Sequence, residues 1–200
     1  HCGKRDRTVA VETNLYNLQP IAVGAKVPSV SLPDLATARV HPLEDYHSER
    51  GLLLILVRHW NCIFCRGQLA DLHTLLPLLE QKTRVVVVMP HKAEYLRTRL
   101  TGRYSLSCTV LCDPEYALYK ALGYGHMRAG DAISPRVLVD GAKLFLGGHI
   151  IGLPDGSLEQ LPGVVAIRAS GIVSARHQHA FASDYLTSDE LLEFAGLAGS

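Results

Sequence analysis

The sequence lacks any long hydrophobic run and any excess of charge of one sign. Its longest uninterrupted apolar stretch is the six residues from Leu52 to Val57, whereas a membrane-spanning helix needs about 20. Lysine and arginine number 20 against 19 acidic residues, so nothing attracts nucleic acid or a charged membrane surface. The polar first residues lack the apolar core of a signal peptide. We expect a cytoplasmic protein that binds neither nucleic acid nor membranes.

Cysteine is also scarce, and the five cysteines cannot all pair with one another. An odd, small number argues against a secreted disulfide scaffold and leaves thiols for chemistry. At 200 residues, 48% of them hydrophobic, the chain is long enough for one well-packed core. We expect an N-terminal arm over residues 1–25 and a single domain over residues 26–200.

Strands and helices alternate along much of the chain. The aliphatic runs 52–57 and 84–89 are typical of strands buried on both faces of a sheet. Leucines three and four residues apart predict a helix over about 64–81, which Pro77 is expected to kink or shorten. The other expected elements are strands at 28–35, 36–41 and 108–111 and helices at 92–103 and 113–122. This order indicates an α/β fold with a largely parallel sheet.

Repeated glycines make residues 123–160 hard to interpret, and we expect an insertion there. Within it, residues 136–146 fit either two strands around an Asp140-Gly141 turn or one helix. After it, the segments 164–169 and 172–176 flank a Ser170-Gly171 turn and predict a hairpin. A last helix is predicted over 189–197, capped by Thr187 or Ser188.

The segment RHWNCIFCR, residues 58–66, lies between a buried strand and an amphipathic helix, where α/β folds place their sites. A cysteine at a helix N-terminus has a lowered pKa, so Cys62 is predicted to be a thiolate nucleophile and Cys65 to attack its oxidised form. Arg58 and Arg66 add positive potential. The alternatives are two packing thiols or half of a zinc site. Zinc is disfavoured because Cys108 and Cys112 are poorly spaced as a second pair, so no metal is expected.

The stretch LLLILVRHWNCIFCRGQLADL resembles the active-site region of the AhpC/TSA-like, peroxiredoxin-like proteins of the thioredoxin superfamily. The order of elements resembles this family from about residue 26 to the C-terminus. The resemblance implies a thioredoxin-like fold with a mixed central sheet flanked by helices. It implies Cys62 as the attacking thiol and Cys65 as the resolving thiol, with Arg58 and Arg66 as flanking cations. It further implies a hydroperoxide or disulfide-like substrate and an electron donor such as thioredoxin, glutaredoxin or a low-molecular-weight thiol; such proteins often form homodimers.

The sequence departs from the P-x-x-x-(T/S)-x-x-C pattern of typical peroxiredoxins, whose hydroxyl orients the peroxide. His59 stands three residues before Cys62, and we interpret it either as a base or thiolate-tuning group or as a wall residue. Trp60 and Phe64 are expected to border the pocket. Pro162 is expected to be the cis-proline that thioredoxin folds place opposite the cysteines, with Pro135 as the alternative. No phosphate-binding loop or dinucleotide motif is present, so no cofactor is expected.

Three functions therefore stay open: a peroxidase, an oxidoreductase acting on a disulfide or specialised metabolite, and a non-enzymatic redox-sensing or binding protein. Cys108 and Cys112 are expected to be buried free thiols rather than a second redox pair, and Cys2 to be incidental. His177 and His179 alternate on a predicted strand and are expected to lie on its surface rather than to bind a metal.

Overall fold

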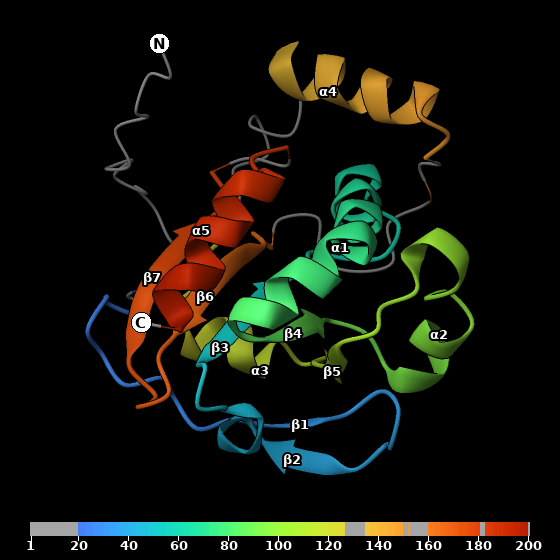
Figure 1. The fold of residues 1–200 in the computed structure, drawn as a ribbon. Helices are drawn as coiled ribbons and strands as arrows, with labels where there is room; N and C mark the ends of the chain where they lie inside the picture. The colour runs from blue at the N-terminus through green and yellow to red at the C-terminus, as the bar shows by residue number, and fades with distance from the viewer. Residues whose placement is uncertain (1–19, 127–134, 150–151, 153–159, 181–182, 200) are drawn as a thin grey trace, which may run out of the picture.

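A computed structural model describes residues 20–126, 135–149, 152, 160–180 and 183–199. Its centre is a five-stranded mixed sheet in the order β5-β4-β3-β6-β7 (Figure 1). The strands are β3 (Leu52–Leu56), β4 (Arg84–Met89), β5 (Thr109–Cys112), β6 (Gly163–Ile167) and β7 (Val173–Gln178). The first three run parallel, and β6 and β7 join antiparallel to β3 and to each other. The predicted hairpin and the mixed central sheet are both present.

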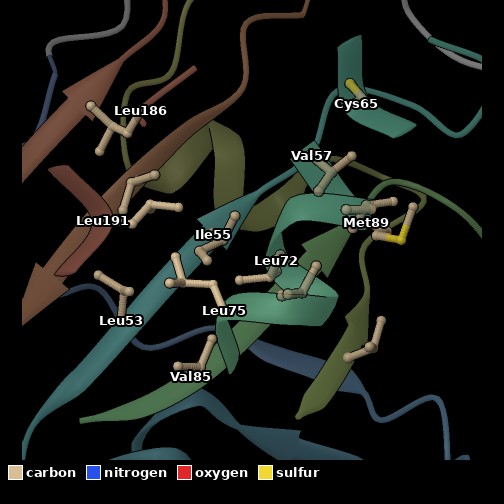
Figure 2. Close-up of a cluster of buried hydrophobic side chains, with 14 of the residues drawn as sticks. Leu53, Ile55, Val57, Cys65, Leu72, Leu75, Val85, Met89, Leu186 and Leu191 are labelled. Carbon is tan, nitrogen blue, oxygen red and sulfur yellow. The ribbon is translucent and has the colours of Figure 1, made fainter. Parts of the chain in front are cut away.

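The central strands are aliphatic throughout because both faces of the sheet are covered. Leu53 and Ile55 belong to a core cluster under α1 (Ile63–Lys82) and α5 (Ser188–Ala198). Leu54 and Leu56 face the opposite cluster, which includes residues of α3 (Ala117–Ala121). Figure 1 shows α1 and α5 side by side over one face of the sheet, and Figure 2 shows the cluster beneath them.

Helix α1 continues through Pro77 to Lys82, so the expected early end is wrong. The ring of Pro77 lies on the exposed side of the helix. The opposite side is anchored in the core by four leucines, and this packing outweighs the loss of one backbone hydrogen bond. The anchoring residues are Leu72, Leu75, Leu76 and Leu79.

Two other predicted helices are shorter than expected. The α-helix predicted over 92–103 is only α2 (Ala93–Arg97), followed by a separate 3-10 turn, η2 (Gly102–Tyr104). Helix α3 begins late because Tyr116 takes a left-handed backbone conformation, with φ of 56°. The edge strands β1 (Ser31–Pro33) and β2 (Val40–Pro42) form their own two-stranded sheet, followed by the 3-10 helix η1 (Leu43–Tyr46).

Of the ambiguous region 123–160, the structure describes one helix, α4 (Pro135–Leu146), which decides between the two readings of 136–146. Glycines let α4 approach α1 closely: a methyl group on Gly67 would lie 2.8 Å from Leu144, and one on Gly141 would lie 3.5 Å from the Phe64 ring. Helix α4, gold in Figure 1, therefore packs beside the N-terminal half of α1.

Part of the expected N-terminal arm lies on the domain. The N–H groups of Ile21 and Gly24 donate to the carbonyls of Leu122 and Val173, while residues 1–19 and Cys2 with them lie outside the described part. Helix α5 begins at Ser188 with a capping box in which Thr187 and Glu190 satisfy each other's backbone N–H groups. Among the described residues, no helix is both long and apolar enough to cross a bilayer.

Candidate active site

The two cysteines of the C-x-x-C segment lie where β3 passes into α1, at the carboxyl edge of the parallel strands. Cys62 is the N-cap of α1, and Cys65 is in its first turn. Both thiols are free and buried, with 5% and 3% of their surfaces exposed. Figure 2 shows Cys65 at the end of the core cluster, beyond Val57. The sequence order of strand, cysteine and helix is thus sufficient to place the sulfurs at this edge.

The sulfur of Cys62 accepts hydrogen bonds from the guanidinium of Arg58 at 3.0 Å and from the main-chain N–H of Cys65 at 3.4 Å. Burial by itself raises the pKa of Cys62. The hydrogen bond from the Cys65 thiol, the charge of Arg58, the nearby His59 and the Cys65 N–H outweigh burial and hold that pKa well below its usual value. Of the two thiols, Cys62 is the one whose surroundings favour the thiolate.

Cys65 has the opposite character although it is equally buried. Burial raises its pKa, and the hydrogen bond it donates to Cys62 and the charge on Cys62 raise it further, well above the usual value. Arg58 and the His59 main chain, which lower it, do not compensate. The surroundings thus favour ionisation of Cys62 and oppose ionisation of Cys65, which is the contrast that a nucleophile and a resolving thiol require.

Arg58 is nearly buried, with 8% of its surface exposed. Burial opposes its charge, but the charges of Cys62 and Cys65 and hydrogen bonds to both sulfurs outweigh this and raise the pKa of Arg58. Arg66 is placed differently from Arg58. Its guanidinium donates to the Trp60 carbonyl at 3.1 Å and to the Asn61 side chain at 2.9 Å, and lies 4.9 Å from the Trp60 ring centre. Arg66 thus stabilises the loop before Cys62 by hydrogen bonds.

The other predicted site residues also gather here. His59 is 2% exposed and is among the groups that lower the pKa of Cys62. Trp60 is buried and meets the ring of Tyr104 edge-on at 5.4 Å, and the buried ring of Phe64 faces Gly141 of α4. Which of these side chains contact a substrate stays a prediction.

The structure confirms the predicted place of Pro162 before a strand but contradicts the predicted cis peptide bond. Pro162 is buried and immediately precedes β6, as predicted, but no peptide bond in the described residues is cis. Its carbonyl accepts the N–H of His179 at 3.1 Å, which extends the β6–β7 pairing by one step. The trans peptide bond is compatible with Pro162 taking part, through its carbonyl, in the pairing between β6 and β7. The alternative, Pro135, is the first residue of α4.

Some side chains of the site come from elements that sequence patterns did not single out. The hydroxyl of Tyr119, on α3, donates to the carbonyls of Val57 at 2.6 Å and Val88 at 3.0 Å, and so ties the ends of β3 and β4 together. The Trp60 N–H donates to His91 at 3.5 Å. No spacing rule connects these residues with Cys62, because they meet only when the sheet forms.

His179 is a second correction. It was expected on a strand surface but is 1% exposed. The strand β7 ends at Gln178, and the N–H of the buried His179 that follows donates to the Pro162 carbonyl at 3.1 Å. Cys108 and Cys112 are free thiols, and the described part of the chain contains no group of three or more ligand side chains placed to bind a metal ion.

Comparisons with known proteins agree with this arrangement. A model of the AhpC/TSA family matches residues 23–176. No curated protein sequence matches the chain. Among solved structures, a peroxiredoxin-like protein from Aquifex aeolicus is 13% identical, with a TM-score of 0.63 over 88% of this chain and 87% of that one. The reduced 2-Cys peroxiredoxin of Plasmodium vivax is 14% identical, with a TM-score of 0.61 over 88% and 81%.

A thiol peroxidase from Chromobacterium violaceum is similar to the same extent, at 13% identity and a TM-score of 0.57 over 88% of this chain and 86% of that one. At these identities the structural likeness establishes the fold. The fold is the thioredoxin-like α/β fold of peroxiredoxins, with its mixed five-stranded sheet and flanking helices.

Proposed function

The chain belongs to the AhpC/TSA family, and on that premise we propose that it reduces a hydroperoxide with the Cys62/Cys65 dithiol. The observation that carries the proposal is the contrast between the two buried sulfurs. Cys62 accepts from Arg58 and from a helix N-terminal N–H and has a lowered pKa, while Cys65 beside it has a raised pKa.

In the first step the Cys62 thiolate attacks the terminal oxygen of the hydroperoxide. A sulfur–oxygen bond forms, the oxygen–oxygen bond breaks, and the alkoxide that leaves takes a proton to become an alcohol. The Cys62 sulfur is oxidised by two electrons to a sulfenic acid. The positive charge of Arg58, 3.0 Å from the sulfur, stabilises the thiolate before the step and the negative charge that moves onto oxygen during it.

In the second step Cys65 attacks the Cys62 sulfenic acid. The new disulfide forms as the hydroxyl leaves, and the proton of the Cys65 thiol makes that hydroxyl water. The Cys65 N–H already lies 3.4 Å from the Cys62 sulfur, so the two residues meet within one helical turn. A thiol donor, such as thioredoxin, glutaredoxin or a small thiol, then reduces the disulfide.

The first experiment is time-resolved intact-mass analysis of the reduced protein after one equivalent of hydrogen peroxide, with peptide mapping. We expect rapid loss of two hydrogens, mapped to a Cys62–Cys65 disulfide. The Cys65→Ser variant should stop at the sulfenic acid, with a gain of one oxygen on Cys62, because no resolving thiol is present. Slow or unmapped oxidation of the wild-type chain would contradict peroxide reduction.

A second function, thiol–disulfide exchange on a disulfide or specialised metabolite, is favoured by one observation. His59, and not a hydroxyl residue, occupies the position three before Cys62, so the usual peroxide-orienting group of the family is replaced by a buried imidazole. A panel of hydroperoxides and small disulfides separates the two. Faster oxidation of Cys62 by disulfides than by any hydroperoxide at equal concentration would favour exchange.

A further inference from the structure

A cavity of about 370 Å³ opens at the end of the sheet opposite the cysteines. It lies where β4 and β5 begin and where α1 ends, whereas Cys62 caps the start of α1. Helix α1 has 20 residues and is therefore about 30 Å long, so the cavity is remote from the thiols. Small-molecule sites typically have volumes of about 300–1,000 Å³, and this cavity falls within that range.

The lining of this cavity is mostly polar and contains charges of both signs. Its charged residues are Arg50, Glu80 and Arg84, which come from the loop before β3, the last turn of α1 and the start of β4. Thr83 lies in the lining beside Arg84. Two guanidinium groups and one carboxylate therefore share a single cavity, in which positive charge is in excess.

These charged groups do not neutralise one another. The Arg84 guanidinium lies 5.6 Å from the centre of the Tyr46 ring and forms no hydrogen bond or ion pair with the described residues. Arg50 donates from one terminal nitrogen to the main-chain carbonyls of Glu80 at 2.9 Å and Gln81 at 3.2 Å, which leaves its other N–H groups available. The Glu80 carboxylate forms no ion pair with any residue that the structure describes.

Thr83 adds a buried hydroxyl to the same lining. The residue is 0% exposed, and its Oγ1 atom has no hydrogen-bond partner in the described part of the chain. A buried hydroxyl without a partner costs free energy and calls for an explanation. A polar group held in the cavity is the partner for which the fold leaves room.

The pattern of charges restricts what the cavity can hold. A simple anion would pair with the guanidinium groups but would be repelled by Glu80, and a simple amine would be repelled by both arginines. A ligand with two acid groups and one ammonium group complements all three charged side chains. Guanidinium groups bind such acid groups through charge-assisted and often bidentate hydrogen bonds.

We propose that this cavity binds a small acidic amino acid, whose two carboxylates pair with Arg50 and Arg84 and whose ammonium group pairs with Glu80. The site is independent of the proposed dithiol function, because it lies at the other end of α1. The ligand connects the end of α1 with the start of β4. Because it binds only the folded chain, it also stabilises the fold.

The test is isothermal titration calorimetry of the reduced full chain with L-glutamate. Two comparison ligands each lack one of its charges: glutarate has no ammonium group, and L-glutamine has no side-chain acid. We expect L-glutamate to bind at least about tenfold more tightly than either, because each lost charge leaves one charged side chain of the lining without a partner. Equal affinity for the three ligands, or no binding of L-glutamate up to about 10 mM, would overturn the proposal.

Variants locate the binding in the cavity. Arg84→Gln should weaken the binding of L-glutamate at least about tenfold, because one guanidinium is lost. The matched control is Lys82→Gln, which removes an exposed positive charge two residues away but outside the lining, and it should stay within about twofold of the wild-type affinity. Equal losses in the two variants would mean that general attraction to positive charge, and not this cavity, holds the ligand.

The role of Glu80 is tested by a change in preference. Glu80→Gln removes the carboxylate that recognises the ammonium group, so the preference for L-glutamate over glutarate should fall below about threefold. An unchanged preference would overturn the proposed pairing. Circular dichroism and the thermal midpoint without ligand establish that each variant is folded.

One further variant separates this site from the proposed function. Cys62→Ser should bind L-glutamate with the wild-type affinity, because the thiols are remote from the cavity. If peroxide oxidises no Cys62–Cys65 pair but L-glutamate binds as expected, only the proposed function is wrong. If the disulfide forms but L-glutamate does not bind, only the cavity proposal is overturned.

Discussion

The chain carries two cysteine pairs, and only one of the four thiols, Cys62, has a lowered pKa. At the β3–α1 junction the pKa of Cys62 is held well below its usual value. Beside and within β5, burial raises the pKa of Cys108 to about 12, with Glu80 adding to the shift, and burial raises the pKa of Cys112 to about 11 against the charge of Arg97. Burial acts in the same direction at all of these sulfurs, so it does not explain the difference.

The difference in pKa comes from the hydrogen-bond donors and charges that lie next to each sulfur. Cys62 is itself the N-cap of a long helix and accepts an N–H from its first turn, with a guanidinium at 3.0 Å. Cys112 also ends a parallel strand, but the residue after it is Asp113, whose carboxylate takes the N–H groups of Ala117 and Leu118. The same edge of the same sheet therefore lowers the pKa of the thiol in one position and raises it in the other.

The largest expected effect tests the contrast directly. Cys62→Ser should lower the rate of peroxide or disulfide turnover at least about a thousandfold, because the nucleophile is removed. Cys108→Ser is the matched control and should leave the rate within about twofold, since a thiol with a pKa of about 12 stays protonated at neutral pH. Turnover is measured with a thioredoxin or small-thiol donor. A similar loss in both variants would mean that the two pairs do not differ in function.

A smaller effect is expected when the guanidinium is removed and the helix N-terminus is kept. Arg58→Met should raise the pKa of Cys62, because a charge that lowers it is lost. The alkylation rate of Cys62 by iodoacetamide at acidic pH should then fall about tenfold, because less of the thiol is ionised, and should approach the wild-type rate at alkaline pH. An equal fall at every pH would show that Arg58 acts on access to the sulfur and not on its ionisation.

The smallest effect concerns stability at alkaline pH. The folded pKa of Cys108 lies above the unfolded one, so its protonated form stabilises the fold below pH 9, and this contribution is lost as the pH rises from 9 to about 12. By pH 10 the part that is lost is on the order of 1 kcal/mol. The free energy of unfolding, measured by denaturant titration at pH 7 and pH 10, should therefore fall less for Cys108→Ala than for the wild-type chain. An equal fall in the free energy of unfolding in both proteins would mean that a group other than Cys108 causes the loss of stability at alkaline pH.

Much of the fold could be predicted from local patterns. The strand β4 begins and ends where its aliphatic run does. The strand β3 ends one residue earlier than predicted, and α1 is one residue longer than predicted at each end. These segments are long and periodic, so their burial decides their conformation. The 92–103 segment was predicted as one helix and is not. Leu96 is its one buried residue and Leu100 is only partly buried, so packing supports a helix there weakly.

The site was predictable only where its residues are neighbours in the sequence. The C-x-x-C spacing and the preceding strand were sufficient to identify Cys62 and Cys65, and Arg58 four residues earlier was identified with them. Arg66 was identified too, but it binds the Trp60 loop, and sequence spacing cannot tell which arginine reaches the sulfur. Pro162 was correctly placed before β6 and wrongly assigned a cis peptide bond.

What the sequence by itself determined is the family, the order of elements and the identity of the thiol pair, because hydrophobic periodicity and one dense motif are local properties. Only the tertiary structure decided which groups surround those thiols. Tyr119 reaches the ends of β3 and β4 from α3, through helix packing over long sequence distances. Burial, which depends on the whole fold, encloses His179, which the sequence pattern had placed on a strand surface.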